Sequence, residues 1–150
     1  MLRDRKWAKV VLLWCTVVAV APGGASGAPQ WLSDRQIAEI FTNATIEGAY
    51  ASGRSFRETY RRDGRVEYSD NGAAMGGSWS ATAGTLCTIY DGDPTGGCFR
   101  VTQTGINCFE FYFATRTAAE LPLSDDERAA WTARGSIESK PGKCGEDVSV

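Results

Sequence analysis

Hydrophobic residues recur at helical spacing early in the chain. Ile37, Ile40 and Phe41 form an apolar stripe that follows Ser33. Ser33 and Gln36 have the spacing of a capping box, in which the two side chains satisfy free amides of the first turn. We therefore predict a helix that begins after Ser33 and ends near residue 42 or 43.

A second capping box occurs near the C-terminus, from Ser124 to Glu127. It predicts a shorter helix that carries Ala129, Ala130 and Trp131. Gly135 occupies the position expected for the C-terminal stop of that helix.

Between these two segments the pattern changes to short runs in which hydrophobic and polar residues alternate. Turn signals such as Ser52-Gly53, Asp63-Gly64 and Thr104-Gly105 recur at a spacing of about 8–12 residues, which is typical of antiparallel sheets and small barrels. The predicted strands are 45–51, 55–61, 65–68, 77–81, 85–90, 98–103 and 108–114. The expected fold is mostly β (α+β): an antiparallel meander or small barrel of about seven strands, flanked by an N-terminal and a short C-terminal helix.

The alternation also predicts which side chains face inward. In strand 108–114 the three phenylalanines, Phe109, Phe111 and Phe113, share one face, which we expect to be core. In strand 55–61 Glu58 shares a face with Phe56 and Tyr60, so a carboxyl group is expected among inward-facing aromatic rings.

The first 27 residues have the three parts of a cleavable export signal. A basic start is followed by an apolar run, 10–21, which is shorter than the ~20 residues that span a bilayer. Small residues at Ala25 and Gly27 fit a cut before Ala28. We therefore predict a signal peptide over 1–27, a single domain over 28–150, and a periplasmic or secreted location without a membrane span.

Four cysteines remain after that cut: Cys87, Cys98, Cys108 and Cys144. In an oxidising compartment an even number favours two disulfides, with three possible pairings. We favour Cys87–Cys98, which closes a short glycine-rich loop, and Cys108–Cys144, which ties down the C-terminal tail. Zinc is the competing use, but no CxxC pair and no histidine are present.

The predicted domain carries 12 Lys+Arg against 17 Asp+Glu, a net charge of −5. Nucleic-acid binding depends on clustered basic residues that neutralise phosphates, so we expect no nucleic-acid partner. The one basic cluster is interrupted by acids and is interpreted as a solvated strand face; it comprises Arg54, Arg57, Arg61, Arg62 and Arg65.

The segments Gly48-Ala49-Tyr50, Phe56-Arg57-Glu58-Thr59-Tyr60, Asp63-Gly64, Gly77-Ser78-Trp79, Leu86-Cys87 and Gly97-Cys98, together with Gly53, resemble a family of small exported bacterial proteins of unknown function. The resemblance covers roughly residues 33 to 113. Gly77-Ser78-Trp79 is also similar to the glycine-x-tryptophan element of lipocalin-like barrels. The resemblance implies a lipocalin-like or meander barrel and no assigned chemistry.

The absence of histidine excludes catalytic triads of the Ser-His-Asp and Cys-His types. A carboxylate pair, Glu58 with Glu110, remains formally open for glycoside hydrolysis, although ordinary structural roles are favoured. Asp91-Gly92-Asp93-Pro94 has spaced carboxylates but lacks the further ligands of a calcium loop, so a plain turn is favoured. We expect no enzyme activity, no cofactor and no metal.

Aromatic residues are abundant in the strand region, and a small barrel buries only part of them. We expect the remainder to line a mouth or an exposed patch, and the candidate binding residues are Tyr60, Tyr90, Tyr112, Trp79 and Glu58. The leading hypothesis is a binding module for an apolar small molecule or an envelope or secreted protein. The alternative is a periplasmic inhibitor of a protease or lysozyme that presents the segment 91–97.

Overall fold

The computed structural model describes residues 29–70, 72–116 and 131–144. Its elements, in chain order, are α1 (Asp34–Phe41), β1 (Ala44–Tyr50), β2 (Ser55–Tyr60), β3 (Arg65–Asp70), β4 (Ala73–Thr82), β5 (Thr85–Tyr90), β6 (Asp93–Gly105), β7 (Cys108–Thr115) and β8 (Ala133–Ile137). The predicted export signal and most of the predicted second helix lie outside the described residues.

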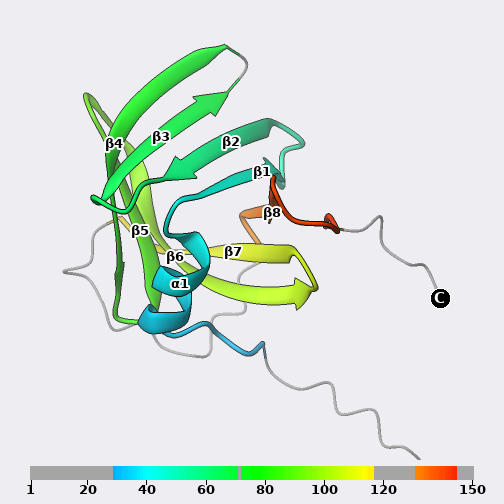
Figure 1. Cartoon of the computed structure of the whole chain (residues 1–150). Coiled ribbons are helices and arrows are strands. Elements are labelled where there is room, and N and C mark those ends of the chain that lie inside the picture. Colours follow the sequence, from blue (N-terminus) through cyan, green and yellow to red (C-terminus); the bar gives the residue numbers. More distant parts are fainter. Residues whose placement is uncertain (1–28, 71, 117–130, 145–150) are drawn as a thin grey trace, which may run out of the picture.

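The strands form a closed antiparallel barrel in sequence order, with β8 pairing back onto β1 (Figure 1). Closure needs an eighth strand, which the sequence analysis did not predict. Gly135 was expected to end a helix, but it lies in the middle of β8. The preference for a helix was wrong there because pairing with β1 and β7 on both sides outweighs a local stop signal.

The closure between β1 and β8 depends on two glycines that face each other, Gly48 and Gly135. A Cβ atom built on Gly48 would lie 2.1 Å from the carbonyl oxygen of Arg134 and 2.8 Å from the Cα of Gly135. Only a residue without a side chain allows the two backbones to approach this closely.

The helix α1 forms where the capping box predicted it. The Ser33 side chain accepts a bond from the Gln36 amide and the Gln36 side chain accepts one from the Ser33 amide. The helix packs against β4, β5 and β1, at the end of the barrel where β4 turns into β5 (Figure 1). The Asp34 carboxylate accepts a bond from the Gly84 amide in that turn. One end of the barrel is therefore covered.

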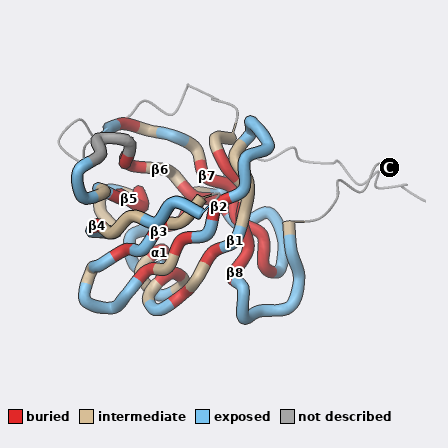
Figure 2. Tube along the Cα trace, turned by 90° about the horizontal axis from the view of Figure 1, so that it is seen from above, coloured by how far each residue is buried: buried red, intermediate tan, exposed pale blue. Residues whose placement is uncertain are grey.

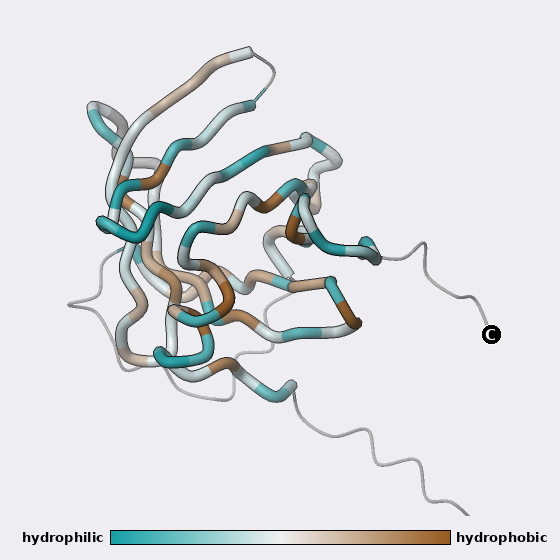
Figure 3. The backbone as a smooth tube through the Cα atoms, viewed as in Figure 1, coloured by the Kyte–Doolittle hydropathy of each residue, from teal (hydrophilic) through white to brown (hydrophobic). Residues whose placement is uncertain are grey.

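Burial alternates along β2 and β3, as the pattern predicted, whereas β5 and β7 each begin with four buried residues (Figure 2). Hydrophobic and hydrophilic residues alternate along the same tubes in Figure 3. The core contains Ile37 and Phe41 from α1 together with inward residues of the barrel, among them Ile46, Val66 and Leu86. Phe109 and Phe111 belong to this core, but Phe113 is 42% exposed, which corrects the expectation. Phe113 lies beyond Phe111, the last β7 residue paired with β8, so no strand of the described residues pairs with it on that side.

Both expected disulfides are present, Cys87–Cys98 and Cys108–Cys144, with S–S distances of 2.02 and 2.15 Å. Cys87 and Cys98 face each other across β5 and β6. The segment between them is not a free loop: Asp91 and Gly92 form a hairpin turn and β6 begins at Asp93. Of the predicted turn Asp91-Gly92-Asp93-Pro94, the first two residues form a turn, whereas Asp93 and Pro94 belong to β6.

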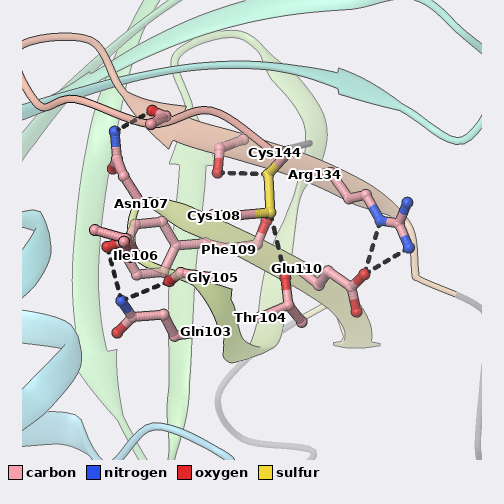
Figure 4. Close-up of a disulfide and its surroundings, with 12 residues drawn as sticks. Gln103, Thr104, Gly105, Ile106, Asn107, Cys108, Phe109, Glu110, Arg134 and Cys144 are labelled. Carbon is pink, nitrogen blue, oxygen red and sulfur yellow. Dashed lines mark hydrogen bonds and ion pairs between the residues drawn. A yellow bond between two sulfur atoms is a disulfide. The ribbon is translucent and has the colours of Figure 1, made fainter. Parts of the chain in front are cut away.

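Beside the second disulfide, buried Asn107 holds the C-terminal segment in place (Figure 4). Its amide nitrogen donates to the carbonyl oxygens of Ile137, Lys140 and Gly142 at 2.8–3.1 Å. Its amide oxygen accepts a bond from the Ile137 amide at 2.9 Å. Asn107 and Cys108–Cys144 therefore fix the chain just after the closing strand.

Candidate functional site

A cavity of about 390 Å³ enters the barrel at the end opposite α1. It is lined by residues at the ends of strands, including Tyr50, which ends β1, and Tyr90, which ends β5. Ala73 and Phe113 at its rim are exposed, whereas Tyr60 and Phe111 at its inner end are buried. The cavity thus runs from solvent into the core, and its size falls within the roughly 300–1,000 Å³ typical of small-molecule pockets.

Glu58 is the charged group at the inner end of this cavity. The alternation in β2 turns it inward with Phe56 and Tyr60, as the sequence predicted, and it is only 7% exposed. Its Oε2 accepts a bond from the Tyr60 hydroxyl at 2.6 Å, and its Oε1 accepts one from the Tyr90 hydroxyl at 2.5 Å. Burial raises the pKa of Glu58 above its ordinary value, and these two hydrogen bonds oppose that rise in part.

The two tyrosines that hold Glu58 are themselves fixed. Tyr60 packs edge-on against Phe41 of α1 and against Trp79 of β4, with ring centroids 5.5 Å apart in both pairs. Burial, and then the Glu58 carboxylate, raise the pKa of both Tyr60 and Tyr90. Both hydroxyls therefore stay protonated and donate to Glu58 at neutral pH.

A second polar chain runs along the wall toward the rim. The Tyr50 hydroxyl donates to the Tyr68 hydroxyl at 3.1 Å, and the Tyr68 hydroxyl donates to Asp70 Oδ2 at 3.2 Å. Arg54 Nε lies 2.9 Å from the same oxygen, and its guanidinium lies over the Tyr50 ring. Asp70 Oδ1 is buried and has no hydrogen-bond partner within the described part of the chain.

The rest of the cavity wall is largely aromatic. Tyr50 packs on Phe56 with ring centroids 5.0 Å apart, and Tyr68 packs on Tyr90 at 5.2 Å. Phe99 and Phe113 form a further pair at 5.7 Å. Met75 and Leu86 add aliphatic surface. The cavity can therefore enclose an apolar group, with polar atoms restricted to a few positions.

Three of the five predicted binding residues meet here: Glu58, Tyr60 and Tyr90. Trp79 does not line the cavity; it lies behind Tyr60, and its indole nitrogen donates to the Arg61 carbonyl oxygen at 2.8 Å. Tyr112 lies on the outer face of β7, so of the two places expected for it, a mouth or an exposed patch, the structure excludes the cavity mouth.

On that outer face Tyr112 donates to Glu110 Oε2 at 2.6 Å, and burial, together with this bond, raises the pKa of Tyr112 to about 12. Arg134 of β8 forms an ion pair with Glu110 Oε1 at 2.7 Å (Figure 4). Glu110 and Glu58 thus face opposite sides of the sheet. They cannot act as an acid and base pair on one substrate.

Sequence reasoning missed Tyr50, Tyr68, Asp70 and Arg54. The alternation of β3 contained a usable signal, because Val66, Tyr68 and Asp70 share the inward face. The predicted strand ended at residue 68, two residues too early.

The basic cluster is a solvated face, as predicted: all five arginines are exposed. Arg57 pairs with Glu47 and Glu138, and Arg61 pairs with Glu67. Over residues 29–70, 72–116 and 131–144, no group of three or more His, Cys, Asp or Glu side chains is placed to hold a metal ion. No helix in this part of the chain is long and apolar enough to cross a membrane.

The fold and site define a small closed β barrel with two disulfides and an aromatic cavity at the end opposite α1. Comparisons with family models, with curated proteins and with solved structures found no match. The barrel that the resemblance implied is present, whereas membership of an exported bacterial family receives no support from these comparisons.

Proposed function

We propose that this protein is a non-catalytic binding module that holds an apolar small molecule in the cavity at the end of its barrel opposite α1. The observation that carries the proposal is the cavity itself: about 390 Å³, walled by aromatic and aliphatic side chains, and continuous from an exposed rim to a buried inner end. A lipocalin-like mode of binding, inside the barrel rather than on its surface, belongs to this proposal.

We also propose that the protein acts in the periplasm or outside the cell, after removal of residues 1–27. The two disulfides support this location, because such bonds persist in oxidising compartments. The N-terminal sequence pattern supports it independently.

A pair of neighbouring alanines provides a sharp test of binding. Ala73 lines the cavity at its rim, whereas Ala74, the next residue of β4, lies on the outer face. Titration with N-phenyl-1-naphthylamine, an uncharged probe whose fluorescence rises in apolar surroundings, should saturate at one site. Ala73→Trp should abolish this binding by filling the mouth, and Ala74→Trp should leave it unchanged.

Two results would refute the proposal: no saturable probe binding, or equal binding by the two tryptophan variants. Native mass spectrometry of the purified protein adds a second readout, because an occupied cavity should give a co-purifying mass that the Ala73→Trp variant loses.

The alternative role, inhibition of a secreted protease or lysozyme, stays a prediction from the sequence. Its predicted presenting element, the segment 91–97, comprises the hairpin turn at Asp91 and Gly92 and the first residues of β6. Assays against a panel of such enzymes test it, and indifference to Asp91→Ala would exclude this turn as the inhibitory element.

A further inference from the structure

We propose that the cavity selects a protonated amine that carries an apolar, ring-sized group, with the ammonium directed at Glu58 and Asp70. The inference rests on the proposed ligand-binding function and specifies its ligand class. It follows from which polar atoms of the cavity are already satisfied and which are free to meet a ligand.

At the inner end, the hydroxyl protons of Tyr60 and Tyr90 are both committed to Glu58. A carboxylate has about four lone-pair positions, so two remain for a ligand. The tyrosine oxygens, having donated their protons, offer only lone pairs. The inner end therefore presents hydrogen-bond acceptors and needs a donor in return.

The hydroxyl protons on the cavity wall are likewise already used in hydrogen bonds. The Tyr50 proton goes to Tyr68, and the Tyr68 proton goes to Asp70 Oδ2. Asp70 Oδ1 has no partner among the described residues, and an unpaired buried oxygen is costly. An ammonium group has three donors and no acceptor, so it can satisfy this oxygen without competing for the tyrosine protons.

The aromatic walls of the cavity also favour a positively charged ligand. The π face of a ring is negative, and a cation within about 6 Å of its centroid is attracted by ~0.5–2 kcal/mol depending on desolvation. Tyr50, Phe56, Tyr68, Tyr90 and Phe99 all line the cavity. A cation that enters the cavity is therefore surrounded by aromatic side chains.

Positive groups are confined to the rim. Among the described residues, the charged side chains that line the cavity are Glu58, Asp70, Arg54 and Arg116. Both arginines are exposed, Arg54 is paired with Asp70, and Arg116 lies over the Phe113 ring. Of these four, Glu58 lies at the buried inner end, so an anionic ligand that enters fully meets a carboxylate with no described cation beside it.

Three probes with one skeleton test the inference: 4-phenylbutylamine, 4-phenylbutan-1-ol and 4-phenylbutanoate, titrated at pH 7 by calorimetry. We expect the amine to bind at least tenfold more tightly than the alcohol, and the carboxylate to bind most weakly. Glu58→Gln should weaken amine binding at least tenfold and change alcohol binding by less than threefold. The matched control Glu110→Gln, on the outer face, should change neither.

Thermal melts check that each variant is folded. If Glu58→Gln does not fold, Asp70→Asn provides an independent test of amine binding. Equal or tighter binding of the carboxylate, or an amine affinity that survives both substitutions, overturns the inference but leaves the ligand-binding function standing. Failure of all three probes, together with no difference between Ala73→Trp and Ala74→Trp, refutes the function itself.

Discussion

The Tyr90 hydroxyl donates a 2.5 Å hydrogen bond to Oε1 of Glu58, joining β5 to β2 across the inside of the barrel. Distances of about 2.5–2.7 Å are typical of hydroxyl groups that donate to a charged acceptor. The bond fixes the carboxylate at the inner end of the cavity. It also links two strands that are not neighbours in the sheet.

Removal of this bond should destabilise the fold. Tyr90→Phe leaves Glu58 Oε1 buried without its donor, so we expect the free energy of unfolding to fall by about 1–3 kcal/mol. Tyr112→Phe is the control, because it removes an equivalent bond to Glu110, which is also buried but keeps the Arg134 guanidinium as a partner. Urea denaturation measures both changes. Equal losses in the two variants would contradict the special role of Glu58.

The raised pKa of Glu58 predicts a dependence of stability on pH. In the unfolded chain Glu58 loses its proton near its ordinary value of 4.5, whereas in the folded protein it holds the proton to a higher pH. Between these two pKa values the free energy of unfolding falls as the pH rises. Above the pKa that Glu58 has in the folded protein, this contribution falls no further. The neutral Glu58→Gln variant lacks this effect. Tyr60 and Tyr90, which face Glu58, and Tyr50, which lies nearby, do not titrate in this range because their pKa values are raised.

Calorimetric melting of the two proteins between pH 4 and pH 8 should therefore show a difference that grows in favour of Glu58→Gln as the pH rises above about 4.5. Titratable groups other than Glu58 are common to both proteins. A constant difference across the range would show that burial does not raise the Glu58 pKa.

Closure of the barrel should be sensitive to Gly48. A Cβ at this position meets the backbone of β8, which cannot move without opening the seam between β1 and β8. We expect Gly48→Ala to lower the free energy of unfolding by about 1–3 kcal/mol. Gly105→Ala, whose Cβ has its nearest contact at 3.4 Å, is the control and should cost much less. A wild-type melting temperature for Gly48→Ala would contradict this close approach.

Asn107 should be intolerant of even a near-isosteric change. Asn107→Asp replaces a donor to three carbonyl oxygens with an acceptor, so we expect a loss of more than about 3 kcal/mol. Gln103→Glu is the control, since Gln103 also donates to two carbonyl oxygens but is exposed to water (Figure 4). Denaturation at pH 7 compares the two, and similar small losses would show that Asn107 does not hold the C-terminal segment.

Much of this fold could be predicted from local patterns. The capping box at Ser33 located α1, alternation with turn residues located seven strands, and four cysteines in a predicted exported chain indicated the two disulfides. The strand β8 could not be found in this way. Its sequence, Ala-Arg-Gly-Ser-Ile, has small residues where it meets β1, and its place is fixed by pairing between distant segments.

The sequence could place a site residue only where the hydrophobic alternation within a single strand was sufficient. Alternation in β2 sufficed to place Glu58 among aromatic rings. The meeting of Glu58 with Tyr90, and of Tyr50 with Tyr68, depends on the register and closure of the barrel, which no local pattern encodes. The alternation of β7 already placed Tyr112 opposite the phenylalanine face, and abundance of aromatic residues was a poor reason to assign it to the mouth.

The most direct test uses Met75, which lines the cavity from β4 and is one of two methionines in the sequence, the other being Met1. In protein labelled with [methyl-¹³C]methionine, the Met75 signal is assigned by its loss in Met75→Leu. Addition of 4-phenylbutylamine should shift this signal in a saturable manner, and the shift should disappear in Ala73→Trp but persist in Ala74→Trp. A Met75 methyl signal that does not move with the amine, the alcohol or the carboxylate would contradict the claim that this barrel binds a ligand inside the end opposite α1.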